Sequence, residues 1–205
     1  MDPNTFPTKG NLILAKNSLA LAKQGYELMD KKRNILIKEL MNLMEQAKDI
    51  QSEIDITFSE AYKALQHANI KMGIHNVEKI CHTIPIDNNI IIKSRSIMGT
   101  EIPLVEYNHK KNFLPYSLYD TSVVLDIAYK HFEKVKQLTI RLSMIENSAI
   151  RLATSIRKTQ KRANALQNIT IPRYTEFVTS ITNSLEEKER EEFIRLKIIK
   201  KTHGS

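Results

Sequence analysis

The chain has 205 residues, a length that usually corresponds to one domain. With 5 Gly, 6 Pro, no Trp and 6% aromatic residues, it offers few chain reversals and little aromatic bulk, so long helices that bury a narrow seam are favoured over a compact globule. The single Cys81 excludes an internal disulfide, and the sequence has no uncharged apolar run of about 18 residues that could span a membrane.

The first predicted element is a long helix after Thr8, whose side chain suits an N-cap. Apolar residues then repeat every seven positions, with no Pro and only Gly25 to weaken the helix. A repeat held this long keeps one stripe facing a partner helix, which predicts a coiled coil. The seam positions, apolar except at Arg33, Thr57 and Lys71, are Leu12, Ala15, Leu19, Ala22, Tyr26, Met29, Arg33, Leu36, Leu40, Leu43, Ala47, Ile50, Ile54, Thr57, Ala61, Ala64, Ala68 and Lys71.

The middle of the chain predicts a small insert. Gly73 is expected to end the first helix, and Ile74–Cys81 to form a short second one. Apolar runs on either side of Lys93–Gly99 predict a β-hairpin, in which Pro103 restricts its strand to an edge. Asn108–Ser117 is expected to be a loop.

A second long helix is predicted from Asp120 or Thr121, either of which suits a cap, to about Lys200. Pro172 predicts a bend or break near Ile171. Beyond Leu166 the heptad slips, and Ile169, Phe177, Ile181 and Leu185 continue an apolar face in a shifted frame. The regular seam positions, apolar except at His131 and Thr159, are Val124, Ala128, His131, Val135, Leu138, Leu142, Ile145, Ala149, Leu152, Ile156, Thr159, Ala163 and Leu166.

The predicted fold is therefore dominated by α-helix. Residues 1–72 and 120–205 form a long antiparallel two-helix coiled coil, kinked near Pro172, and residues 73–119 form an insert with a hairpin and a short helix. We expect both termini at one end of the coiled coil and the hairpin at the other.

The net charge of +8 is concentrated in the C-terminal part, where Arg151–Arg173 holds six basic residues and no acidic one. This stretch is either a solubilising surface or a contact for phosphates or another anionic partner. No interleaved aromatics or nucleic-acid module accompany it, so no nucleic-acid partner is predicted. The mixed charges of Glu186–Glu192 are either a solvated helix face or a partner contact.

No catalytic constellation is predicted. Thr8-Lys9-Gly10 lacks the glycine-rich cradle of a phosphate loop. His75 and His82 flank Cys81 without a recognisable metal spacing, so we predict neither metal nor cofactor and interpret Cys81 as an apolar filler. His131 in the seam is interpreted as a satisfied polar core residue, and seam Arg33 as either a register determinant or a side chain that reaches solvent.

Three segments resemble the D subunit of the V/A-type rotary ATPases. They are Pro7–Leu12 with the Lys31–Arg33 cluster, Arg162–Leu166 followed by Ile171–Arg173, and Leu185–Phe193 followed by Arg195–Lys197. The order and spacing agree over nearly the whole chain, although Gln167 stands where that family usually has Glu.

The resemblance implies a central rotor shaft that is not itself an enzyme. It implies insertion into a head of catalytic and regulatory subunits (A and B), binding of the F subunit of the central stalk, and docking on a funnel-shaped subunit of the membrane rotor, on the cytoplasmic side of the membrane. A coiled-coil scaffold or adaptor is the alternative, followed by a basic nucleic-acid-binding coiled coil. Head contacts are predicted at Lys9, Arg162, Arg173, Arg190, Arg195 and Lys197, and partner contacts of the hairpin at Ile90, Ile91, Ile92 and Lys93.

Overall fold

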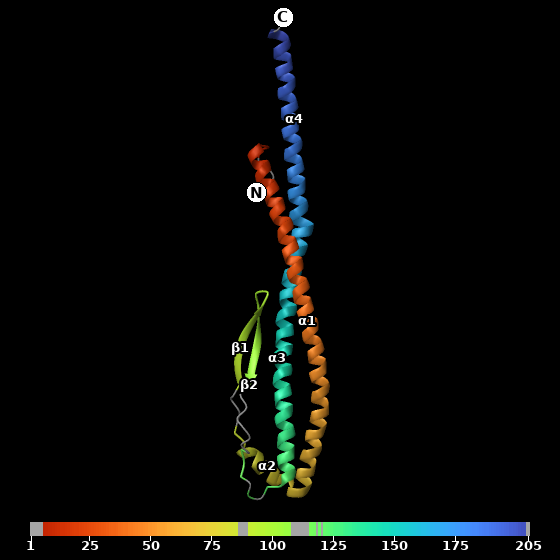
Figure 1. Cartoon of the computed structure of the whole chain (residues 1–205), viewed down its shortest axis with the longest axis vertical. Coiled ribbons are helices and arrows are strands. Elements are labelled where there is room, and N and C mark those ends of the chain that lie inside the picture. The colour runs from red at the N-terminus through yellow and green to blue at the C-terminus, as the bar shows by residue number, and fades with distance from the viewer. Residues whose placement is uncertain (1–5, 86–89, 108–114, 118, 120, 204–205) are drawn as a thin grey trace. The chain divides into compact units, whose positions relative to one another are not determined.

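The computed structural model describes every residue except 1–5, 86–89, 108–114, 118, 120 and 204–205. In chain order its elements are α1 (Lys9–Met72), α2 (Ile74–Thr83), β1 (Ile90–Ile97), β2 (Thr100–Tyr107), α3 (Val123–Ala165), the π-helical turn η1 (Leu166–Thr170) and α4 (Ile171–His203) (Figure 1). The long N-terminal helix packs against the long C-terminal helical segment, and the insert between them is a short helix and a hairpin. The predicted fold class is confirmed.

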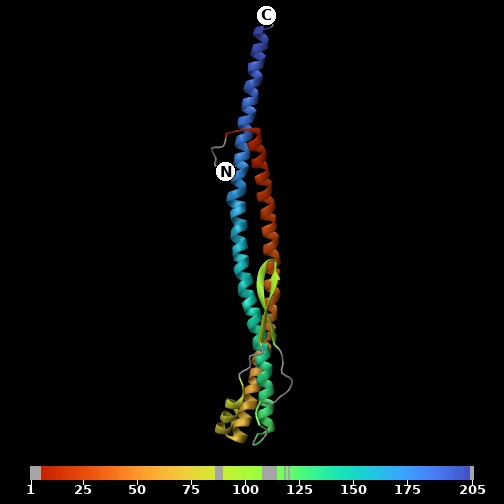
Figure 2. The same ribbon diagram turned by 90° about the vertical axis from the view of Figure 1, so that its left-hand side faces the viewer.

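The chain divides into two compact units. The terminal unit comprises Met1–Ile35 and Ile156–Ser205, and the central unit comprises Leu36–Ser155. In each unit a part of α1 runs antiparallel to a part of the C-terminal helical segment. Arg33 contacts Gln160 in the terminal unit, and Glu53 pairs with Lys134 in the central unit (Figures 1 and 2).

The helix ends follow their capping residues. The backbone N–H of Asn11 donates to Thr8 Oγ1 at 3.2 Å, which confirms the predicted N-cap of α1. Gly73, at φ 83°, ends α1 in a conformation that other residues rarely adopt. At α3 the cap is Ser122, whose carbonyl accepts from the N–H of Leu125 at 2.9 Å. Of the two predicted caps, Thr121 was wrong, since it precedes the cap. Asp120 lies outside the described residues, as does most of the loop predicted at Asn108–Ser117.

The heptad register is confirmed in both helices. In α1 every predicted seam position except Lys71 is buried or half-buried, and in the second series every position is. Leu36 and Leu152 are fully buried, and alanines such as Ala15 and Ala61 let the helices approach closely. The hydroxyl of the buried Thr57 donates to its own helix, at the carbonyl of Glu53.

A π-turn carries the chain past Pro172. The N–H of Ile171 bonds to the carbonyl of Leu166, five residues back, so the turn holds one extra residue and shifts the apolar face. Ile169, predicted on that face, is instead 65% exposed, while Phe177, Ile181 and Leu185 are buried or half-buried as predicted. The chain stays helical through the proline, so no break occurs there, and a bend near Pro172 stays a prediction.

The hairpin is closed by the two-residue turn Met98-Gly99, and both residues have positive φ (49° and 74°), which fits the right-handed twist of the strands. Pairs along the hairpin alternate between hydrogen-bonded and non-hydrogen-bonded, starting from the hydrogen-bonded pair Ile97–Thr100 at the turn. Pro103 falls in a non-hydrogen-bonded pair, so its missing N–H would point away from β1 and the ladder loses no bond. The outer edge of β2 faces α3 instead: the carbonyl of Glu101 accepts from Arg151 at 3.3 Å.

A small core joins α2 to the ends of α1 and α3. Ala68, Val77, Tyr116 and Leu125 bury their side chains together. Tyr116 donates to Asp126 Oδ1 at 2.6 Å, which ties the segment before α3 to that helix. None of the helices in the described part of the chain is long and apolar enough to cross a membrane.

Candidate interaction surfaces

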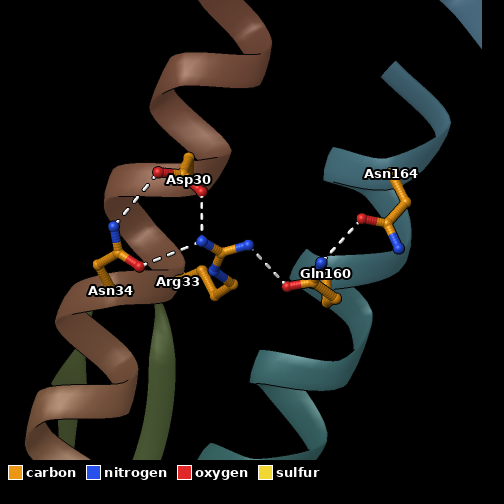
Figure 3. Close-up of polar contacts among 5 residues, drawn as sticks. All are labelled: Asp30, Arg33, Asn34, Gln160 and Asn164. Atoms are coloured by element: carbon orange, nitrogen blue, oxygen red, sulfur yellow. Dashed lines mark hydrogen bonds and ion pairs between the residues drawn. The ribbon is translucent and has the colours of Figure 1, made fainter. Parts of the chain in front are cut away.

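The seam of the terminal unit contains one polar layer, centred on Arg33 (Figure 3). Arg33 donates from Nη1 to Gln160 Oε1 of the opposite helix at 2.9 Å, and Nη2 pairs with Asp30 and donates to Asn34 Oδ1. Gln160 in turn donates to Asn164 Oδ1 at 2.8 Å. The guanidinium is therefore satisfied by its own helix and by the partner helix.

This polar layer can fix the alignment of the two helices. The Arg33 side chain is 25% exposed, with the fully buried Leu36 one turn further along α1. An apolar seam tolerates a slip by one heptad, but a slip would leave a partly buried guanidinium without its amide partner. The contact across the seam therefore favours the interpretation of Arg33 as a register determinant over its interpretation as a side chain that reaches solvent.

The six predicted head-contact residues all lie in the terminal unit, but they do not form one cluster. Lys9 Nζ lies 2.9 Å from Glu189 Oε1, and this hydrogen bond raises the pKa of Lys9 above its ordinary value. Arg190 lies 3.8 Å from Glu186. Within the described residues the other four make no ion pair, and all are exposed: Arg162, Arg173, Arg195 and Lys197.

The last part of α4 is exposed on every side. From Glu186 to Thr202 each residue is exposed, including the whole Glu186–Glu192 charge run. The large apolar side chains there are Phe193, Ile194, Leu196, Ile198 and Ile199, each at least half exposed. Exposed apolar side chains gathered on one stretch of helix are typical of an interaction site. This exposed surface could have been predicted from the sequence, because the apolar residues after Phe193 follow no single heptad frame.

The hairpin presents its isoleucines on two faces. Ile90 and Ile92 share one face with Val105, and that face lines a groove of about 420 Å³ against Ile140 and Met144 of α3. Ile91 points to the other face and is 46% exposed. Lys93 pairs with Glu106 across the strands at 2.7 Å, so its charge is neutralised within the hairpin.

The residues considered for metal binding or reactivity have other surroundings. His131 Nδ1 lies 3.7 Å from Glu60 Oε2 in the seam, which fits the predicted polar core residue. Cys81 is exposed, so its interpretation as an apolar filler was wrong: only Val77 of the short α2 is buried. Among the described residues no group of three His, Cys, Asp or Glu is placed to hold a metal ion.

Fold and surfaces together define a coiled-coil protein with large exposed surfaces for contacts. Residues 11–201 match the family model of the ATP synthase D subunit. The chain is 44% identical to the D subunit of the V-type ATP synthase of Thermotoga neapolitana, over 95% of this chain and 96% of that one. It is 34% identical to the D subunit of the A-type ATP synthase of Thermococcus kodakarensis, over 96% and 94% of the two chains.

The chain belongs to the D-subunit family of V/A-type ATP synthases, which confirms the resemblance seen in its sequence. It is a non-catalytic component of the central stalk of such a complex.

Proposed function

We propose that the chain is the rotating shaft of the complex, and that it couples ATP turnover in the head to ion movement through the membrane rotor on the cytoplasmic side of the membrane. The observation that carries this proposal is the pair of antiparallel helix seams, one in each unit, together with the Arg33–Gln160 layer. A shaft under torque must resist both bending and sliding of its helices. A packed heptad seam supplies stiffness, and a polar contact satisfied in one alignment opposes sliding.

The terminal unit is the part that contacts the A and B subunits of the head. Its support is the exposed end of α4, where apolar side chains such as Phe193 and Leu196 lie in water in the isolated chain. The exposed cations Arg195 and Lys197 stand among them, with Arg162 and Arg173 further back along the chain and Lys9 and Arg190 beside the acidic run. Burial of this surface against a partner would remove a large apolar area from water.

The central unit is the part that contacts the F subunit and the funnel-shaped subunit of the membrane rotor. Its support is the hairpin, in which Ile91 and Ile92 are largely uncovered by this chain. A two-stranded hairpin is marginal alone. α3 supports the edge of β2, the groove face and, through the bond of Thr100 to Ser155, part of the other face. A partner over the exposed Ile91 would complete its packing.

Rotation itself tests the proposal, and Cys81 gives the attachment point. It is the only cysteine of the chain and it is exposed, so the purified chain takes a maleimide-biotin at one position before assembly with the other subunits. With the head fixed to a surface, a bead on Cys81 is expected to turn in one direction when ATP is added. A Cys81→Ser chain carries no bead and serves as the control. ATP hydrolysis at full rate beneath a stationary bead would refute the shaft function.

A further inference from the structure

A belt of cations surrounds the terminal unit at the level of the Arg33–Gln160 contact. Because Arg33 of α1 meets Gln160 of α3, the residues just before Arg33 and those on either side of Gln160 lie at similar heights along the seam. All six members of the belt are basic: Lys31, Lys32, Arg157, Lys158, Lys161 and Arg162.

The belt is uncompensated within the described part of the chain. None of its six members makes an ion pair there, although five are exposed and Lys32 is half-buried. Asp30, the carboxylate beside Lys31, is already occupied by Arg33 and Asn34. Single lysines without an ion pair also occur in the central unit, Lys48 and Lys63 among them, beside paired ones such as Lys134. The belt differs from these because six basic residues lie at one level.

The spacing of the cations on α3 is itself unfavourable. Arg157 and Lys161 are four residues apart, and so are Lys158 and Arg162, which places like charges next to each other on the helix surface. Such pairs destabilise an isolated helix, and a bound anionic partner reverses the sign of their effect. The arrangement therefore suits a bound state better than the free chain.

Four of the six cations lie on the outer sides of the helices, while Lys32 and Arg162 flank the seam. With Arg33 and Ala163 in the seam, Lys31 and Lys161 both occupy the heptad position opposite it, on the outer sides of α1 and α3. A partner that touches one side of the coiled coil reaches only part of the belt. A partner that reaches all of it must enclose both helices.

We propose that this belt binds carboxylate-bearing segments of the protein subunits that enclose the terminal unit, as an electrostatic bearing around the coiled coil. The inference rests on the proposed shaft function, since it assigns the surrounding partner to the head. Nucleic acid is the less suitable partner, because no aromatic residue stands among positions 27–33 or 157–169 for base stacking, and a duplex lies along one side. Acidic segments arranged around the belt would stabilise it from all sides.

Two charge-reversal variants test the two sides of the belt separately. One is Lys31→Glu with Lys32→Glu on α1, and the other is Arg157→Glu with Lys161→Glu on α3. The matched control reverses Lys48 and Lys63, which are exposed on α1 in the central unit and make no ion pair among the described residues. Each chain carries a fluorophore on Cys81, and anisotropy reports its binding to the assembled head subunits at several NaCl concentrations.

Both belt variants are expected to bind the head about tenfold more weakly than the wild type at low salt and to show a shallower salt dependence, with the control within about threefold. Circular dichroism establishes that each variant is helical, and Gln substitutions at the same positions replace any variant that is not. Equal affinity and equal salt dependence of both belt variants and the wild type would overturn the inference while leaving the shaft function intact.

Two other results would lead to different conclusions. A wild-type chain that does not bind the head at all would overturn the shaft function and this inference together. Tight binding of duplex DNA by the wild type, lost in both belt variants alongside unchanged binding to the head, would assign the belt to nucleic acid instead.

Discussion

Gly25 of α1 lies opposite Leu166, the first residue of the π-turn: a β-carbon added at Gly25 would stand 3.8 Å from Leu166 Cδ1, an ordinary van der Waals distance. Gly25→Ala therefore adds a contact and lowers the entropy of the unfolded chain without a clash. We expect it to raise the free energy of unfolding by about 0.5–1 kcal/mol, measured by urea denaturation. Gly10→Ala, with no atom within 4 Å of the added carbon, is the control and gains only the helix-propensity part. A loss of stability in Gly25→Ala would mean that α1 and the π-turn lie closer together at Gly25 than the 3.8 Å distance to Leu166 Cδ1 indicates.

Leu152 and Leu43 test the seam of the central unit. Leu152 is fully buried, so Leu152→Asp places an unpaired carboxylate in the seam and is expected to cost about 3–5 kcal/mol. Leu43 is half-buried and its replacement by Asp should cost less, because the charge can reach water. Thermal unfolding followed by circular dichroism measures both. Leu21→Asp, at a position that is 70% exposed, should leave the melting temperature nearly unchanged, and equal melting temperatures for all three variants would show that the seam is misplaced.

The seam was predictable because a seven-residue repeat can be recognised in a single sequence, and burial follows the repeat at nearly every position. The sequence also showed that the repeat slips after Leu166, but it did not show that the slip takes the form of a π-turn. A π-turn depends on which carbonyl each N–H selects near Pro172, and one extra residue moved Ile169 out of the buried face.

The polar contacts were less predictable than the seam. Arg33 stood out as a charge at a seam position, yet its partner Gln160 lies outside the predicted seam positions, so nothing in the repeat identified it. The exposure of Cys81 also depends on tertiary packing, since α2 buries only Val77.

Because Arg33 and Gln160 contact each other, the effects of replacing them on the free energy of unfolding are expected to be non-additive. Arg33→Met removes the donor and Gln160→Leu the acceptor, and each alone should cost about 1 kcal/mol because it leaves polar groups of the layer unpaired. The double variant should recover about 0.5–1.5 kcal/mol of the summed loss, as two apolar side chains then meet in the seam. Urea denaturation of the four chains gives the cycle. Strictly additive losses would show that the two side chains do not interact in solution.

Tyr116 gives the central unit a sensitivity to high pH. Burial, followed by the hydrogen bond to Asp126, raises the pKa of Tyr116 well above the ordinary tyrosine value. Because the folded pKa is the higher one, this stabilisation is complete below about pH 10 and is lost as the pH rises above it, when the unfolded chain ionises first. Melting temperature should therefore fall above about pH 10, and less steeply in Tyr116→Phe. Tyr119→Phe, at a 90% exposed position, should keep the wild-type pH profile. Identical profiles for Tyr116→Phe and the wild type would show that Tyr116 does not contribute to the loss of stability at high pH.

The hairpin can be removed with little disturbance to the helices, because Ile90 and Tyr107 face each other as strand partners at its base. Replacing Ile91–Glu106 by a Gly-Ser bridge joins two residues that are already adjacent in space. On α3 the deletion removes hydrogen-bond partners of Met144, Arg151 and Ser155, none of which is fully buried.

We expect the shortened chain to keep its helical circular dichroism but to bind its partners more weakly or to alter the ATPase rate of the assembled complex, since the uncovered face of the hairpin is lost. Ser96→Ala is the control: Ser96 is exposed on the face of the hairpin opposite Ile91, so the variant keeps the proposed contact face and should assemble like the wild type. Native mass spectrometry of the complex and its steady-state ATPase rate are the two measurements. If the shortened chain assembles and supports ATP turnover as the intact chain does, the hairpin is only a connector between α2 and α3, and the partner contact assigned to Ile91 is wrong.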